Sequence, residues 1–139
     1  MIQSINHIGI AVNNLEESKA LYAKIFDVKH FHEEIVEEQK VAIASFSVGD
    51  VLLELTAPLD DQSPIANFLS KRGEGIHHIA FSSNAIHEDL QNLGEKGIQL
   101  INKEPKQGAH EMLIGFLHPK STGGVLMELC QLNSDYTKE

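Results

Sequence analysis

The sequence contains a single cysteine, Cys130, and no tryptophan among its 139 residues. One cysteine cannot form an intramolecular disulfide, so a disulfide framework is excluded and the cytoplasm is the expected location. The longest apolar runs, such as Ile8–Val12 and Val51–Leu55, have the length of a strand and are far too short to cross a membrane. The first residues lack a basic segment followed by a long apolar one, so no signal peptide is expected.

Positive charge is scarce, with 11 Lys and Arg residues against 20 Asp and Glu residues and a net charge of −9 at pH 7. Nucleic-acid binding needs a basic face, so a nucleic-acid partner is excluded, and the sequence offers no membrane partner either. The composition, 42% hydrophobic and 22% charged, is that of a soluble globular protein. Its length predicts one domain, 1–139, that buries about 68% of the surface of the unfolded chain.

Two segments of the sequence recur, which indicates a duplicated unit. Residues 6–13 return 71 positions later as residues 77–84, and residues 49–55 return 74 positions later as residues 123–129. Each copy begins with a histidine and ends with a glutamate. Two copies related by a pseudo-twofold axis would bring these four side chains towards one point.

Hydrophobic periodicity predicts the same order of elements in both copies. In unit one, about 3–58, a helix capped by Asn14 follows the first of four strands, which are expected over 5–12, 28–35, 41–46 and 51–56. A linker helix, about 63–72, has Ser63 as its cap and Pro64 at its first position. In unit two, about 74–132, a helix capped by Asn84 follows the first of four strands, which are expected over 76–82, 98–102, 112–117 and 125–131.

These elements predict an α+β fold made of two β-α-β-β-β units. Short connections between the later strands of each unit favour antiparallel pairing there. We expect the eight strands to form a cup-shaped pair of half-barrels around a shared metal site.

The duplicated histidines and glutamates supply the predicted metal ligands: His7, Glu54, His78 and Glu128. Glu54 and Glu128 stand within strongly apolar strands, where a carboxylate without a partner costs several kcal/mol or gives up its charge. A cation bound by both glutamates would compensate for the burial of their charge in both copies. Four nitrogen and oxygen ligands suit one divalent ion such as Co, Zn, Ni or Mn better than calcium.

Strand alternation distinguishes His78 from its neighbour His77. His78 shares a face with Ala80 and Ser82, which are small, whereas His77 shares the opposite face with bulky residues that pack on a helix. The repeat also aligns His7 with His78. We therefore expect His78 to be the ligand.

With these ligands named, the chain resembles the vicinal oxygen chelate superfamily, and within it the methylmalonyl-CoA epimerases. The resemblance runs from the first strand to Glu128 and includes these segments: residues 57–59, 63–69, 75–79, 108–110, 116–120 and 123–129. It implies an isomerase that interconverts (R)- and (S)-methylmalonyl-CoA through a metal-stabilised enolate by 1,1-proton transfer. It also implies the metal ligands named above, an acyl-CoA substrate and a homodimer.

The inversion needs a base on one face of the α-carbon and an acid on the other, and Glu128 and Glu54 are the expected catalytic pair. Some family members carry glutamine at the position of Glu54, and some carry an acidic residue in the strand that is here residues 41–44, where this chain has none. Candidates for substrate binding are Lys106, His110 and Lys120. Lys71, Arg72 and Lys103 are further cations available for the phosphates of coenzyme A.

Three other functions fit parts of this pattern. A glyoxalase I-type lactoylglutathione lyase also uses two histidines and two glutamates, but this chain lacks that enzyme's Asp-Pro-Asp-Gly hairpin. An iron-dependent dioxygenase would use His7, His78 and Glu128 and leave Glu54 without a role. A metal-free protein that sequesters small molecules would not need the four ligands.

Overall fold

The structure is a computed structural model, and it describes residues 1–133. Its chain divides into two compact units. We call His7–His77 the N-terminal unit; the C-terminal unit comprises Met1–Asn6 together with the chain from His78 onward. The linker helix thus belongs to the N-terminal unit, and the first six residues belong with the second copy of the repeat. That the whole chain forms one domain stays a prediction.

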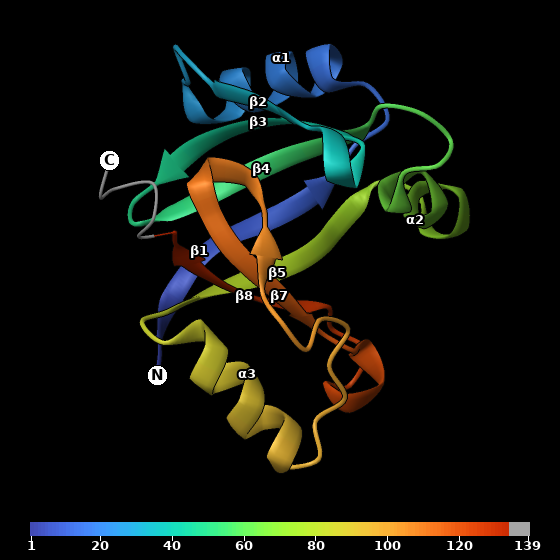
Figure 1. The fold of residues 1–139 in the computed structure, drawn as a ribbon. Coiled ribbons are helices and arrows are strands. Elements are labelled where there is room, and N and C mark those ends of the chain that lie inside the picture. Colours follow the sequence, from blue (N-terminus) through green and yellow to red (C-terminus); the bar gives the residue numbers. More distant parts are fainter. Residues whose placement is uncertain (134–139) are drawn as a thin grey trace. The chain divides into compact units, whose positions relative to one another are not determined.

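The N-terminal unit contains the first four strands, the first of them only from His7 onward, and α1 lies over its sheet (Figure 1). Its elements are β1 (Ile2–Ala11), α1 (Leu15–Phe26), β2 (His32–Val36), β3 (Val41–Val48), β4 (Val51–Pro58), α2 (Pro64–Arg72) and a 3-10 turn (Glu37–Gln39). The strand order is β2-β3-β4-β1. The pairs β2/β3 and β3/β4 are antiparallel, as expected, and β1 pairs with β4 in parallel.

Local sequence signals place the two helices of this unit. The Asn14 side chain accepts a hydrogen bond from the Glu17 backbone N–H, and the Ser63 hydroxyl accepts one from Ile65, so both predicted caps are confirmed. Asp27, in the left-handed region at φ 57°, ends α1 and turns the chain, so β2 begins at His32 rather than at residue 28. One face of the sheet buries Val12, Leu55 and Ala57 against α1.

The C-terminal unit repeats this architecture. Its elements are β5 (Gly75–Ser83, in this unit from His78 onward), α3 (Ile86–Glu95), β6 (Lys106–Gln107), β7 (Met112–Leu117), β8 (Met127–Leu132) and two 3-10 turns (Ala109–Glu111 and Pro119–Ser121). The strand order is β5-β8-β7-β6, with β5 and β8 parallel and the other pairs antiparallel. Ile86 and Leu90 of α3 pack on Leu117 and Leu129 of the sheet. The α+β class and the two β-α-β-β-β units are confirmed.

The strand predicted over residues 98–102 is wrong, and the short β6 takes its place. The N–H groups of Ile101 and Asn102 both point to the carbonyl oxygen of Phe116, and the Asn102 side chain accepts the hydrogen bond of the Phe116 N–H. A side-chain oxygen here replaces a backbone acceptor, so a regular ladder does not form. Only an isolated bridge between Leu100 and Leu117 remains in this stretch.

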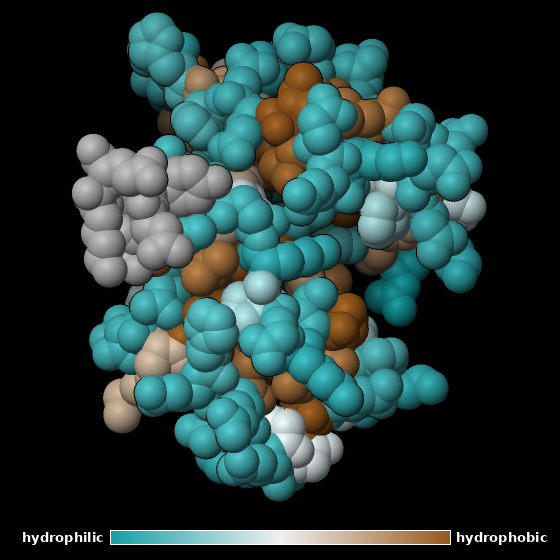
Figure 2. Space-filling model, viewed as in Figure 1, coloured by the Kyte–Doolittle hydropathy of each residue, from teal (hydrophilic) through white to brown (hydrophobic). Residues whose placement is uncertain are grey.

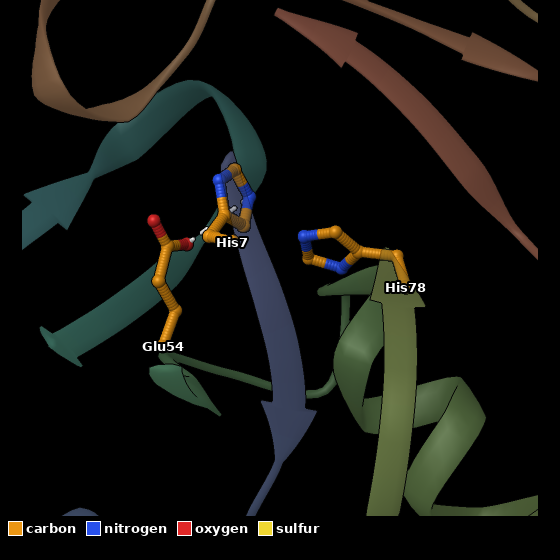
Figure 3. A group of neighbouring side chains, drawn as sticks. All are labelled: His7, Glu54 and His78. Carbon is orange, nitrogen blue, oxygen red and sulfur yellow. Dashed lines mark ion pairs between the residues drawn. The ribbon is translucent and has the colours of Figure 1, made fainter. Parts of the chain in front are cut away.

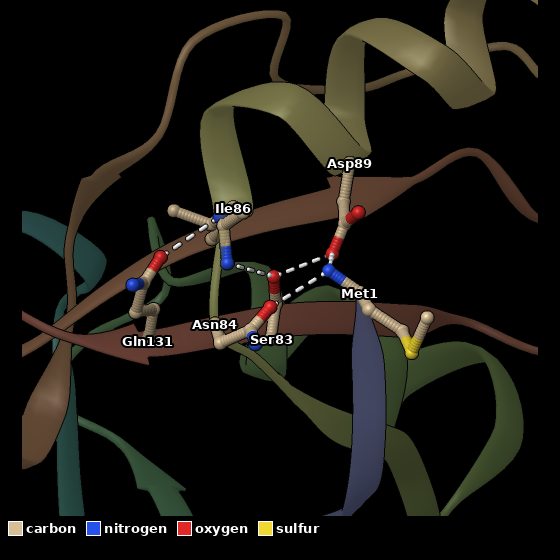
Figure 4. A network of polar contacts seen from close by, with 7 residues as sticks. Met1, Ser83, Asn84, Ile86, Asp89 and Gln131 are labelled. Atoms are coloured by element: carbon tan, nitrogen blue, oxygen red, sulfur yellow. Dashed lines mark hydrogen bonds and ion pairs between the residues drawn. The ribbon is translucent and has the colours of Figure 1, made fainter.

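Helix α3 begins one residue later than predicted, because Asn84 is engaged elsewhere (Figure 4). The Asn84 side chain accepts a hydrogen bond from the N-terminal ammonium group of Met1. The Ser83 hydroxyl instead accepts from the Ala85 N–H and donates to Asp89, at 2.6 Å. The ammonium nitrogen of Met1 also lies 2.9 Å from Asp89 Oδ2. The first turn of α3 is therefore held by Met1 and by Ser83, the last residue of β5.

The face shown in Figure 2 is mostly hydrophilic, with apolar areas over α1. Leu21, Ile25 and Phe26 of α1 are each at least 43% exposed. None of the helices in residues 1–133 combines the length and the apolar character needed to span a membrane.

We expect the substitution Asp89→Asn to destabilise the protein by about 1 kcal/mol at neutral pH, because a charge-assisted contact is lost. Burial raises the pKa of Asp89, but the Ser83 hydroxyl and the Met1 ammonium group together outweigh it and leave the pKa below its ordinary value of 3.8. The stabilisation is thus present above that value and lost as the pH falls through the lowered pKa. Urea unfolding at several pH values measures it. Glu88→Gln, an exposed change on the same helix, is the matched control, and equal effects of the two variants would contradict this assignment.

Candidate metal centre

In the N-terminal unit, His7 of β1 lies beside Glu54 of β4 (Figure 3). The parallel register pairs Gly9 with Glu54. His7 is two residues before Gly9 on β1, so the side chains of His7 and Glu54 lie on the same face of the sheet. His7 Nε2 is 3.6 Å from Glu54 Oε1. Both side chains are buried, with 6% and 3% of their residue surface exposed.

The C-terminal unit builds the same pair from β5 and β8. Here the register pairs Ala80 with Glu128, at the positions equivalent to Gly9 and Glu54. His78 Nε2 is 3.7 Å from Glu128 Oε1, and the two residues are 8% and 4% exposed. The Phe116 ring meets the His78 imidazole edge to face, with 5.9 Å between centroids.

The geometry of each pair fits two ligands of one divalent cation. At 3.6 and 3.7 Å, the nitrogen and oxygen atoms are too far apart for a normal hydrogen bond. Two ligand atoms of a tetrahedral zinc site, each 2.0–2.1 Å from the ion, are about 3.4 Å apart. Each unit also buries a carboxylate beside an imidazole, and these two ligand types are ones that such ions accept.

His77 lies apart from this chemistry. Its ring packs edge to face on Phe68 of α2, with 5.0 Å between centroids. Burial lowers the pKa of His77 from 6.5 to about 4. The structure therefore puts His78 beside a buried glutamate and His77 against an aromatic ring, in agreement with the alternation of β5.

The predicted substrate-binding residues lie in the C-terminal unit, outside the His78–Glu128 pair. Lys106 in β6 and Lys120 in the turn after β7 are exposed. His110 is partly buried and adopts the left-handed region at φ 56°. Their role in binding stays a prediction.

Two residues beside Glu54 escaped the prediction from sequence. Ser45 of β3 is the cross-strand partner of Glu54, and Thr56 follows Glu54 by two residues, so both share its face. The equivalent positions beside Glu128 hold Phe116 and Cys130. Period-two alternation in the apolar strands 41–46 and 51–56 is the sequence signal that could have identified these two residues.

The sequence profile of the Glyoxalase/Bleomycin resistance protein/Dioxygenase superfamily matches residues 6–116. The chain belongs to this superfamily. The match begins just before His7 and spans both units.

Individual relatives narrow the class. The chain is 44% identical to the uncharacterized protein YqjC of Bacillus subtilis, over 97% of this chain and 96% of that protein. It is 41% identical to the mitochondrial methylmalonyl-CoA epimerase of Dictyostelium discoideum, over 92% and 78%. A variant of the Streptomyces coelicolor methylmalonyl-CoA epimerase, in complex with 2-nitronate-propionyl-CoA, shares the fold with a TM-score of 0.90 and 35% identity, over 94% and 95%. Within the superfamily, the chain belongs to the methylmalonyl-CoA epimerases, a family of isomerases.

The lowered pKa of His77 predicts acid sensitivity. The unfolded chain takes up a proton near pH 6.5 and the folded chain only near pH 4, so stability falls as the pH drops from about 6.5 to about 4. We expect the His77 ring signals in NMR to titrate with a midpoint near 4. The variant His77→Phe should lose this part of the pH dependence of unfolding. A midpoint near 6.5 in the folded protein would contradict the prediction.

Proposed function

We propose that this protein interconverts (R)- and (S)-methylmalonyl-CoA by moving one proton between the two faces of the α-carbon. The observation that carries the proposal is the buried His–Glu pair at the same sheet position in each unit. A single exchanging proton needs two acid–base groups, one for each face, and the duplication supplies two glutamates. The identity to named epimerases over most of the chain supports the choice of substrate.

We further propose that one divalent cation is held by these four residues: His7, Glu54, His78 and Glu128. The separations within each pair and the burial of both carboxylates support this set. When bound, such a cation would neutralise the negative charge that develops on the thioester oxygen as the α-proton leaves. Co, Zn, Ni and Mn all accept this combination of ligands.

Glu54 and Glu128 carry the proton in this proposal. One group, as the carboxylate, takes the α-proton from its face, and the other, which starts as the carboxylic acid, donates its proton to the opposite face. Each lies on a strand that is held on both sides by neighbouring strands, so the sheet fixes the positions from which the carboxylates reach the carbon. Both carboxylates are nearly fully buried, which limits the contact of bulk water that would otherwise compete for the proton.

The substrate also carries phosphates, which the acidic chain must bind through local cations. Lys106 and Lys120 are exposed and available for this role, and His110 lies near Lys106 in the sequence. A homodimer and a cytoplasmic location remain expectations from the family and from the single cysteine.

Proton exchange in heavy water tests the proposed reaction. We expect the protein to incorporate deuterium at the α-carbon of methylmalonyl-CoA, as measured by NMR. The variant Glu128→Gln should lower this rate by at least about 100-fold, since a group that transfers the proton is lost. Glu104→Gln, an exposed change in the same unit, should leave the rate unaltered.

The same preparation is assayed with the hemithioacetal of methylglyoxal and glutathione. Turnover of only this second compound would replace the proposal with a glyoxalase I-type lyase. Binding of small apolar molecules with no exchange of either substrate would indicate a sequestering protein.

Cation binding gives a second test, with two adjacent histidines as matched variants. Titration calorimetry with Co²⁺ should show that His78→Ala lowers the affinity by at least about 100-fold, because a direct ligand is removed. His77→Ala should leave the affinity unaltered, since His77 packs on Phe68. Equal losses in both variants, or full exchange activity after exhaustive chelation, would refute the ligand set.

A further inference from the structure

Two hydroxyl groups lie next to Glu54 on the same face of the N-terminal sheet. Ser45 is directly opposite Glu54 in the antiparallel β3/β4 pair. Thr56 is two residues beyond Glu54 on β4, and alternation returns its side chain to that face. The carboxylate of Glu54 therefore has a hydroxyl on the neighbouring strand and another along its own strand.

Both hydroxyls are buried, and neither has a hydrogen-bond partner among the described residues 1–133. Ser45 is 1% exposed and Thr56 is 4% exposed. A buried hydroxyl without a partner destabilises a fold, and a methyl group of similar size would be less costly at either position. Polar groups that weaken a fold in this way are characteristic of functional sites.

The C-terminal unit shows that the sheet itself does not need these hydroxyls. At the position equivalent to Ser45 it carries Phe116, and at the position equivalent to Thr56 it carries Cys130. Cys130 is fully buried in a cluster with Ala80 and Ile114. The same architecture is thus built with an apolar ring and a thiol beside Glu128. The surroundings of the two glutamates differ although their backbone positions are equivalent.

We propose that Ser45 and Thr56 are positioning residues for Glu54, and that their hydroxyls donate hydrogen bonds to its carboxylate when Glu54 holds the proposed cation. This proposal rests on the proposed function, in which Glu54 transfers a proton. The hydroxyls give the carboxylate a second set of partners on its own face, so that it keeps a defined position while it acts on the substrate. The equivalent positions beside Glu128 carry a ring and a thiol in place of the two hydroxyls, so the two glutamates are not interchangeable.

The variants Thr56→Val and Ser45→Ala remove one hydroxyl each and keep the shape of the side chain. Ser47→Ala, the same chemical change at an exposed position of β3, is the matched control. Thr56→Ser restores a hydroxyl and tests rescue. We measure three quantities for each variant: the urea midpoint of the cation-free protein, its Co²⁺ affinity by calorimetry, and deuterium wash-out from each separate epimer of methylmalonyl-CoA.

For Thr56→Val and Ser45→Ala, we expect a urea midpoint that is unchanged or raised, because an unsatisfied hydroxyl is gone. The Co²⁺ affinity should fall about tenfold, as it does when a group that orients a ligand is lost. Wash-out should fall about tenfold for the one epimer served by Glu54 and stay unchanged for the other. Thr56→Ser should recover both quantities, and Ser47→Ala should match the original protein.

Unchanged Co²⁺ affinity and unchanged wash-out in both hydroxyl variants would overturn the proposal. An equal fall in the wash-out rate of both epimers, together with a lowered urea midpoint, would indicate a structural role and would also overturn it. If the original protein exchanges neither epimer, the proposed function fails. The calorimetry then still decides the inference about Ser45 and Thr56: a loss of Co²⁺ affinity that Thr56→Ser restores supports it, and no loss refutes it.

Discussion

The burial of a carboxylate inside each sheet is the constraint on which the rest of the structure depends. Glu54 and Glu128 are among the most buried polar residues of the chain, and each stands in an apolar strand. Taking a charged carboxylate out of water is costly unless charge or hydrogen bonds compensate. In each unit a histidine on the neighbouring parallel strand lies within 3.7 Å of the carboxylate, and the small residues Gly9 and Ala80 leave room beside it. The strand order places the partner next to the charge.

Duplication explains how a small chain presents two buried His–Glu pairs, and divergence explains how their surroundings differ. The two units share strand order, register and the His–Glu pair. They differ in the residues across from and along the strand from each glutamate: two hydroxyls in one unit, an aromatic ring and a thiol in the other. A reaction that removes a proton from one face of a carbon and returns one to the other face needs a base on one side and an acid on the other, and different surroundings favour these two roles. Changes of this kind alter the chemistry around a glutamate without altering the sheet.

The elements that were hardest to predict are those whose hydrogen bonds come from distant parts of the chain. Residues 98–102 have the composition of a strand, yet Asn102 offers its side chain to Phe116 and interrupts the ladder. Asn84 is a favourable cap in sequence, but its side chain accepts from Met1, and Ala85 becomes the N-cap residue without a side-chain cap hydrogen bond. Asn14 and Ser63 kept their predicted roles, and within residues 1–133 no distant residue competes for their side chains. Local preference decides a cap only where tertiary contacts leave it alone.

The sequence by itself determined which residues share a face, because strand alternation and helix periodicity are local properties. It therefore identified the α+β class, the duplicated units, and His7, Glu54, His78 and Glu128 as the residues of interest. Only the tertiary structure decided that β1 pairs with β4, and β5 with β8, in parallel and in which register. Those pairings join residues more than forty positions apart, and nothing local encodes their alignment. The neighbours of each glutamate, and so its chemistry, follow from that alignment.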